Sequence, residues 1–335
     1  MKFLIAGAGA IGAYIGARLS RAGFDVTLFA RGLHLKAMQE HGVQVRSPEG
    51  DFEAFPSVVG SLDEVGPVDV VFLGVKAHGL SQLAPRLRPV LRPDTTVVST
   101  QNGVPWWFFQ GFGAPRELNR LERVDPGGVI SAAIEPRSVL GSIIYFSAEI
   151  TAPGVIQHIE GSRISLGEPD GTRSERLRGI AEALIAARLK APITTRIRHE
   201  IWVKLLGNVA FNPVSALTGC TLGEMARDPD LSELIRNIMK ETEAVGTKIG
   251  LELPISIEQR IAGAEKVGGH KTSMLQDLEA RRPLELEAIV GAVVELGERV
   301  GVAMPYTRAV YACTKALSRV RCQYAPGRSG SDAAT

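Results

Sequence analysis

Three polar residues interrupt an apolar stretch at residues 201–212, where the sequence is Ile-Trp-Val-Lys-Leu-Leu-Gly-Asn-Val-Ala-Phe-Asn. Lys204, Asn208 and Asn212 are four residues apart, so in a helix of about 3.6 residues per turn they form one narrow stripe. The rest of the circumference is apolar, which predicts a buried helix. A lysine in such surroundings has a lowered pKa and can give up a proton or bind an anion.

A structural lysine that reaches water, with the two asparagines as helix caps, is the alternative for this stripe. Pro213 disfavours helical geometry for the residue before it, so we expect Asn212 at a helix end or kink. Further along, Pro283 suits the first position of another helix, with Glu285 in its first turn. Because acidic residues favour helix N-termini, Glu285 has a structural explanation as well as a chemical one.

The N-terminus carries the pattern of a nucleotide-binding turn. The apolar residues 3–6 predict a buried strand, the segment Gly7-Ala8-Gly9-Ala10-Ile11-Gly12 follows, and residues 14–22 have a helical pattern. In this spacing the first glycine allows a tight turn, the second lets a pyrophosphate approach the backbone, and the third lets the helix pack on the strand. A glycine-rich turn without a ligand is the alternative.

Arg31 follows the second predicted strand, residues 26–30, where an NAD-binding protein usually has an acidic residue for the ribose hydroxyls. A guanidinium group pairs with a ribose 2′-phosphate, whereas a carboxylate repels it. The residue therefore predicts NADP(H) as the cofactor, and an ordinary surface arginine is the alternative.

Two further apolar runs, residues 68–74 and 95–100, predict strands that are covered on both faces. They lead to Lys76 and Asn102. Strands that alternate with helical segments predict an α/β fold, a Rossmann-like doubly wound parallel sheet in which ligands bind beyond the carboxyl ends of the strands.

The strand-rich pattern ends near residue 170, and long helical patterns follow. We expect an NADP-binding domain at residues 1–170, an all-helical substrate domain at 171–324 and a disordered tail at 325–335. The aromatic run at residues 106–109 either packs in a core or between subunits, or it lines a pocket, and packing is favoured. Exposed aromatic residues there would suit a homodimer.

The composition describes an ordinary globular protein, with 335 residues, 45% hydrophobic residues and a net charge of +2. This charge provides no basic tract for nucleic acid or for a membrane surface. The cysteines, Cys220, Cys313 and Cys322, lack metal-binding spacing, and we expect no metal. Neither a targeting segment nor a transmembrane run is evident, so we expect a cytoplasmic protein.

Together these stretches resemble the ketopantoate reductase (2-dehydropantoate 2-reductase) family. The resemblance covers about residues 1–310. The motifs that carry it, in family order, are the glycine turn, Val75-Lys76, Gln101-Asn102-Gly103, Trp202-Val203-Lys204 through Asn208 to Asn212-Pro213, and Ser273-Met274-Leu275-Gln276-Asp277 with Glu285.

The resemblance implies that NADPH reduces 2-dehydropantoate to (R)-pantoate for pantothenate biosynthesis. It implies Lys204 as general acid and Glu285 as the acidic residue near the substrate hydroxyl. The remaining residues implied by it are Asn208, Asn212 and Ser273 for the substrate, Asn102 for substrate and nicotinamide, and Lys76 and the backbone of Ala148 for the cofactor.

Two departures from the family pattern bear on the substrate. Residues 104–140 form a longer segment than the family pattern has, and Leu222 stands where some members carry a substrate-binding asparagine. The alternatives are therefore an NADPH-dependent reductase of another branched 2-oxo acid and a non-catalytic NADP-sensing protein of the same fold.

Overall fold

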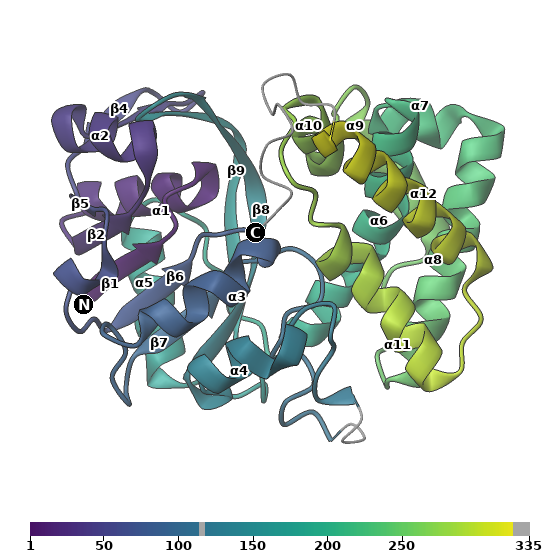
Figure 1. The fold of residues 1–335 in the computed structure, drawn as a ribbon, viewed down its shortest axis with the longest axis horizontal. Helices are drawn as coiled ribbons and strands as arrows, with labels where there is room; N and C mark the ends of the chain where they lie inside the picture. Colours follow the sequence, from purple (N-terminus) through teal and green to yellow (C-terminus); the bar gives the residue numbers. More distant parts are fainter. Residues whose placement is uncertain (114–117, 324–335) are drawn as a thin grey trace, which may run out of the picture. The chain divides into compact units, whose positions relative to one another are not determined.

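The structure is a computed structural model that describes residues 1–113 and 118–323 (Figure 1). Its contacts divide the chain into one compact unit, Met1–Ile201, and a second unit that starts at Trp202. This division lies further along the chain than residue 170, where the strand-rich sequence ends. The tail predicted for residues 325–335 lies outside the described residues.

The first unit is built on a sheet that has nine strands within the described residues, in the order β4-β3-β9-β8-β7-β6-β1-β2-β5. The strands are β1 (Lys2–Ala6), β2 (Asp25–Phe29), β3 (Val43–Arg46), β4 (Phe52–Ala54), β5 (Ser57–Val59), β6 (Val70–Leu73), β7 (Thr96–Ser99), β8 (Val139–Ala152) and β9 (Val155–Gly167). The run from β8 through β7, β6, β1 and β2 to β5 is parallel, as predicted for a Rossmann-like domain.

The other end of the sheet adds antiparallel pairs. β8 and β9 form a long antiparallel hairpin, and β3 pairs parallel to β9 and antiparallel to β4. The sheet is therefore mixed rather than wholly parallel. The short strands of residues 43–59 lie at the two edges of the sheet, with β3 and β4 at one edge and β5 at the other.

Only Phe55 and Pro56 separate β4 from β5, although these strands are at opposite edges of the sheet. Since consecutive Cα atoms are about 3.8 Å apart, the two edges come close together, and the sheet must curl into a half-barrel. Helix α1 (Ala10–Arg21) contacts β1 and β2 as well as β3, β4, β8 and β9. It is consequently buried over Gly12–Leu19.

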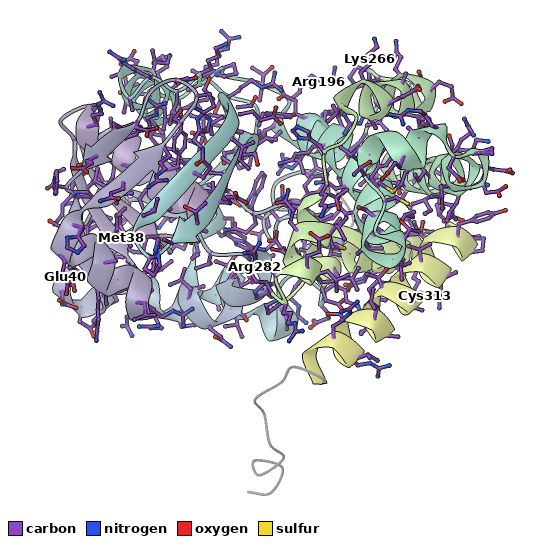
Figure 2. The ribbon with its side chains drawn as sticks, turned by 90° about the horizontal axis from the view of Figure 1, so that it is seen from above. Met38, Glu40, Arg196, Lys266, Arg282 and Cys313 are labelled. Carbon is purple, nitrogen blue, oxygen red and sulfur yellow. The ribbon has the colours of Figure 1, made fainter. Side chains whose placement is uncertain are left out.

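The remaining helices of this unit cover the sheet and its strand ends. They are α2 (Gly32–His41), α3 (Leu80–Leu83), α4 (Val129–Ala133) and α5 (Glu175–Ala186). Met38 of α2, labelled in Figure 2, is buried in the core that α1 shares with the sheet.

The aromatic run is packed inside the first unit. Trp106, Trp107, Phe108 and Phe109 are each at most 5% exposed. The buried guanidinium of Arg198 donates hydrogen bonds to the backbone carbonyls of Phe108, Gln110 and Pro169, and burial lowers its pKa to about 10. The favoured interpretation, packing, is confirmed. These four aromatic side chains therefore offer no exposed surface for a homodimer. The homodimer itself stays a prediction.

The second unit is helical, as predicted. Its helices are α6 (Ile197–Thr218), which begins in the first unit, α7 (Leu222–Arg227), α8 (Pro229–Lys248), α9 (Ile257–Val267), α10 (Ser273–Glu279), a π-helical turn (Glu287–Gly291) that continues into α11 (Ala292–Val300), and α12 (Pro305–Gln323). α8 contacts α7, α9, α11 and α12. Cys313 lies exposed on α12 (Figure 2).

Two helix boundaries differ from the prediction. α6 continues through Pro213 to Thr218, so Asn212 lies inside the helix and not at its end, and a kink at this residue stays a prediction. Burial of Val209, Phe211 and Val214 stabilises the helix against the local preference of the residue before proline. The helix expected at Pro283 begins only after Glu285.

Candidate active site

The glycine turn leaves β1 and enters α1, as its spacing predicts. Gly7 has a φ of +113°, and a Cβ at this position would lie 2.8 Å from the backbone nitrogen of Val75. A Cβ on Gly12 would lie 2.9 Å from Cγ2 of Ile5. Only glycine therefore allows the turn, the start of the helix and the strand to pack this closely.

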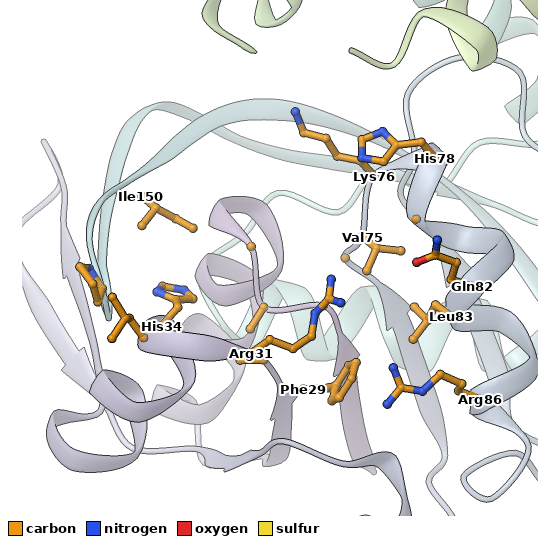
Figure 3. A pocket seen from close by; sticks show the side chains of 18 of the residues that line it. Phe29, Arg31, His34, Val75, Lys76, His78, Gln82, Leu83, Arg86 and Ile150 are labelled. Carbon is orange, nitrogen blue, oxygen red and sulfur yellow. The ribbon is translucent and has the colours of Figure 1, made fainter. Parts of the chain in front are cut away.

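A cavity of about 800 Å³ opens beside this turn (Figure 3). Its lining combines the turn at Gly7–Gly9, the end of β2 at Phe29–Arg31, the residues after β6 at Gly74–Lys76, and the end of β8 with the first residue of the β8–β9 turn, at Ile150–Pro153. The parallel strands thus end at one side of the sheet, with Arg31 and Lys76 at the cavity. This is the position that a doubly wound sheet gives to a nucleotide.

Two arginines line the cavity. Arg31 and Arg86 are both exposed and come from different elements, and their side chains lie on either side of Phe29 in Figure 3. The guanidinium carbon of Arg86 is 5.3 Å from the centre of the Phe29 ring. The sequence analysis missed Arg86, because no spacing rule connects the turn Ala84–Leu87 with the end of β2.

His34 also lines the cavity and connects two of its segments, and the sequence analysis did not identify it. Its Nδ1 accepts a hydrogen bond of 2.9 Å from the backbone nitrogen of Gly154 in the β8–β9 turn. Burial lowers the pKa of His34, which favours the neutral imidazole. The side chain therefore connects α2 with the β8–β9 hairpin.

The other predicted cofactor residues, Ala10, Ile11, Gly12, Asn102 and Ala148, lie outside the set of described residues that line the cavity. Asn102 is half-buried beyond β7. The Gln101 amide beside it donates hydrogen bonds to the carbonyls of Leu73 at 2.7 Å and Val75 at 3.0 Å, which fixes the loop before Lys76. Ala148 lies in β8, two residues before Ile150.

In the helical unit, α6 presents the predicted polar stripe. Lys204 and Asn208 are half-buried and Asn212 is buried, although most of the surrounding helix is fully buried. Burial lowers the pKa of Lys204 to about 8. The charge of Glu285 opposes this shift, and the charge of Arg260 adds to it. Lys204 thus has the properties of a proton donor near neutral pH.

Two other residues of the predicted substrate site, Glu285 and Ser273, are on other segments of this unit, and so is Leu222, which departs from the family pattern. Glu285 precedes Leu286, the residue that caps the π-helical turn, and its carbonyl accepts a hydrogen bond of 3.2 Å from the backbone nitrogen of Ile289. Ser273 is the exposed first residue of α10, after the cap Thr272. The backbone nitrogen of Leu222 donates to the carbonyl of His270 at 3.0 Å, so α7 begins next to the segment that leads to Ser273.

Arg260 is the residue of this region that the sequence analysis missed. It lies on α9, and its guanidinium packs against α6 at Gly207. An arginine on a separate helix has no sequence pattern that connects it with Lys204, so only the packing of α9 on its neighbours reveals it.

A cavity cradled by glycines on an α/β sheet and a helical unit with a titratable lysine suit a nucleotide-dependent oxidoreductase. Residues 3–171 match the family described as ketopantoate reductase PanE/ApbA, and residues 196–318 match its C-terminal domain. The chain therefore belongs to the ketopantoate reductase family, whose members are pyridine-nucleotide-dependent oxidoreductases.

Individual relatives agree with this assignment. The chain is 47% identical to a 2-dehydropantoate 2-reductase of Mesorhizobium japonicum, over 97% of this chain and 100% of the relative. A proposed ketopantoate reductase from Ralstonia solanacearum MolK2 has a TM-score of 0.91 at 39% identity, with 96% and 98% of the chains covered. A 2-dehydropantoate 2-reductase from Methylococcus capsulatus has a TM-score of 0.82 at 31% identity, with 98% and 99% covered.

The part of the chain that the structure describes has neither a membrane-spanning helix nor a cluster of metal ligands. Within residues 1–113 and 118–323, no helix combines the length and the apolar character needed to cross a membrane. The same described residues contain no cluster of three or more histidine, cysteine, aspartate or glutamate side chains that could hold a metal ion.

Proposed function

We propose that the protein reduces 2-dehydropantoate to (R)-pantoate with NADPH, as a step of pantothenate biosynthesis. The observation that carries the proposal is Lys204, a half-buried lysine with a pKa of about 8 in the same unit as Glu285. The family assignment and the name of the 47% identical relative support the substrate.

The cavity of the first unit fits a dinucleotide. Gly7 and Gly9 line it without side chains, and the helix α1 starts beside them, so backbone N–H groups are available to phosphates. We infer that the segment Gly7–Gly12 and Lys76 hold the cofactor, with Asn102 at the nicotinamide and the backbone near Ala148 on the hairpin side. When bound, NADPH supplies the hydride for the carbonyl carbon.

We attribute the preference for NADP(H) over NAD(H) to Arg31 and Arg86. Two guanidinium groups at the end of β2 can pair with a 2′-phosphate, and the ring of Phe29 between them limits where the ribose lies. Charge-assisted, bidentate hydrogen bonds to phosphate are the strongest that a protein side chain makes.

Lys204 then completes the reduction. As the carbonyl carbon becomes tetrahedral, negative charge develops on the carbonyl oxygen, and the ammonium group of Lys204 gives its proton to this oxygen. The charge of Glu285 favours the protonated form of Lys204, because it raises the lysine pKa. Asn208, Asn212 and Ser273 orient the substrate with neutral hydrogen bonds.

The direct test is oxidation of NADPH in the presence of 2-dehydropantoate and, separately, of other branched 2-oxo acids. We expect 2-dehydropantoate to have the highest kcat/KM, and Lys204→Met to lower kcat by about 10²- to 10⁴-fold. If the protein reduced only a different 2-oxo acid, the assignment of 2-dehydropantoate as the substrate would be wrong. Leu222 would then explain the change of substrate, because it stands where some family members carry a substrate-binding asparagine. NADPH binding without turnover of any acid would favour a sensor.

A further inference from the structure

A glycine stands in the middle of α6, next to the proposed proton donor. Gly207 is buried, although glycine weakens a helix interior relative to alanine. A side chain at this position would meet Arg260, since an added Cβ would lie 3.1 Å from the guanidinium carbon and 3.3 Å from Nε. The glycine therefore gives the guanidinium room to lie against the backbone of α6.

α9 holds Arg260 in this place. Ser256 caps the helix, with its side chain and that of Gln259 closing a capping box, and Ile257 and Ile261 are buried on the inner face. Arg260 lies directly beside these two isoleucines on the helix surface and is itself half-buried. The capped start of α9 and its buried apolar face thus fix the backbone position from which the Arg260 side chain extends.

The guanidinium and the proposed acid share one side of α6. At about 100° per residue, Gly207 lies about 60° to one side of Lys204 and Asn208 about 40° to the other. The charge of Arg260 also lowers the pKa of Lys204, which agrees with a short separation between the two cations.

We propose that Arg260 binds the carboxylate of the 2-oxo acid while Lys204 protonates the neighbouring carbonyl oxygen. A 2-oxo acid carries these two groups on adjacent carbon atoms, so an enzyme needs a carboxylate-binding group beside its proton donor. A guanidinium fork matches a carboxylate with two parallel hydrogen bonds. The inference rests on the proposed function and extends it to the substrate class, since a neutral ketone would not use this contact.

The test compares Arg260→Met with the wild-type protein on 2-dehydropantoate and on its methyl ester, which lacks the charge. For the acid we expect KM to rise about 10- to 100-fold. We expect the kinetics of the ester and the KM for NADPH to stay unchanged. Arg260→Lys keeps the charge without the fork and should fall between the two proteins.

A matched pair of alanine variants tests the geometry. Gly207→Ala displaces the guanidinium and should raise KM for the acid, whereas Gly263→Ala places a methyl group in open space on α9 and should leave KM unchanged. Circular dichroism and the dissociation constant for NADPH show whether each variant is folded.

Binding measurements separate this inference from the proposed function. Calorimetry with 2-dehydropantoate and the NADP⁺-loaded protein reports acid binding without turnover, and Arg260→Met should lose it even if the wild-type protein reduces no tested acid. Equal losses for acid and ester in Arg260→Met, or undiminished acid binding, would overturn the role of Arg260.

Discussion

The cations proposed for cofactor binding in the first unit and for proton transfer in the second have opposite surroundings. Arg31 and Arg86 are exposed at the edge of the cavity beside the glycine turn, whereas Lys204 is half-buried in an apolar helix, where burial lowers its pKa to about 8. A group that binds phosphate needs a permanent charge, and guanidinium supplies it at every physiological pH. A group that transfers a proton needs a pKa near the working pH.

Glycine has a related role in both units. Gly7 lets the turn after β1 come close to the backbone at Val75, and Gly207 lets the guanidinium of Arg260 come close to α6. At Gly7 the missing side chain lets two backbone segments approach each other, and at Gly207 it lets an arginine lie against a helix. Glycine thus allows a close approach in both units, and the units differ in the type and the burial of the cations proposed to act in them.

The largest effect is expected when the titratable cation of the second unit is replaced by a permanently charged one. Lys204→Arg keeps a positive charge but holds its proton, so we expect kcat to fall by about 10²- to 10⁴-fold, as far as in Lys204→Met. Steady-state kinetics at saturating substrate measure this change, and NADPH affinity serves as the control for folding. A variant with near-normal kcat would show that a fixed charge is sufficient.

An intermediate effect is expected at the exposed arginines. Arg31→Gln and Arg86→Gln should each raise KM for NADPH about tenfold, because each removes a charge-assisted contact to the 2′-phosphate. KM for NADH, which lacks this phosphate, should not change. Arg88→Gln, two residues after Arg86 and also exposed, is the matched control. If NADH and NADPH are affected equally, the arginines support the cavity rather than select the phosphate.

The sequence predicted the features that local patterns encode. The glycine turn, the central parallel strands, the helical second unit and the stripe from Lys204 to Asn212 depend on neighbours along the chain. The contributions of Arg86 and Arg260 depend on which elements pack together, and no spacing expresses that. The same applies to the curled sheet, because the pairing of β3 with β9 joins segments more than a hundred residues apart.

The wrong predictions have the same origin. Pro213 disfavours a helical Asn212 locally, but burial of the apolar side chains around it holds α6 helical to Thr218. Pro283 was expected to start a helix, yet the chain becomes helical only after Glu285. This shift places the Glu285 carboxylate at the helix start, within reach of the charge of Lys204.

The smallest expected effect is a change in the pH dependence of kcat/KM. It tests directly whether Lys204 is the titrating cation. Reduction needs protonated Lys204, so kcat/KM should fall as the pH rises through about 8. The Glu285 charge raises the pKa of Lys204, so Glu285→Gln should move this fall to lower pH, and Arg260→Met should move it to higher pH.

Profiles of kcat/KM against pH are measured on both sides of pH 8. They distinguish a change in the pH at which kcat/KM falls, the alkaline limb of the profile, from a change in the maximum value of kcat/KM. Glu279→Gln is the control, because Glu279 is exposed and pairs with Lys271. The Arg31→Gln profile should keep the wild-type fall near pH 8, since the charges that shift the pKa of Lys204 are those of Glu285 and Arg260. If Glu285→Gln and Arg260→Met shifted the limb in the same direction, the titrating group would not be Lys204, and the distinction between a permanent and a titratable cation would lose its basis.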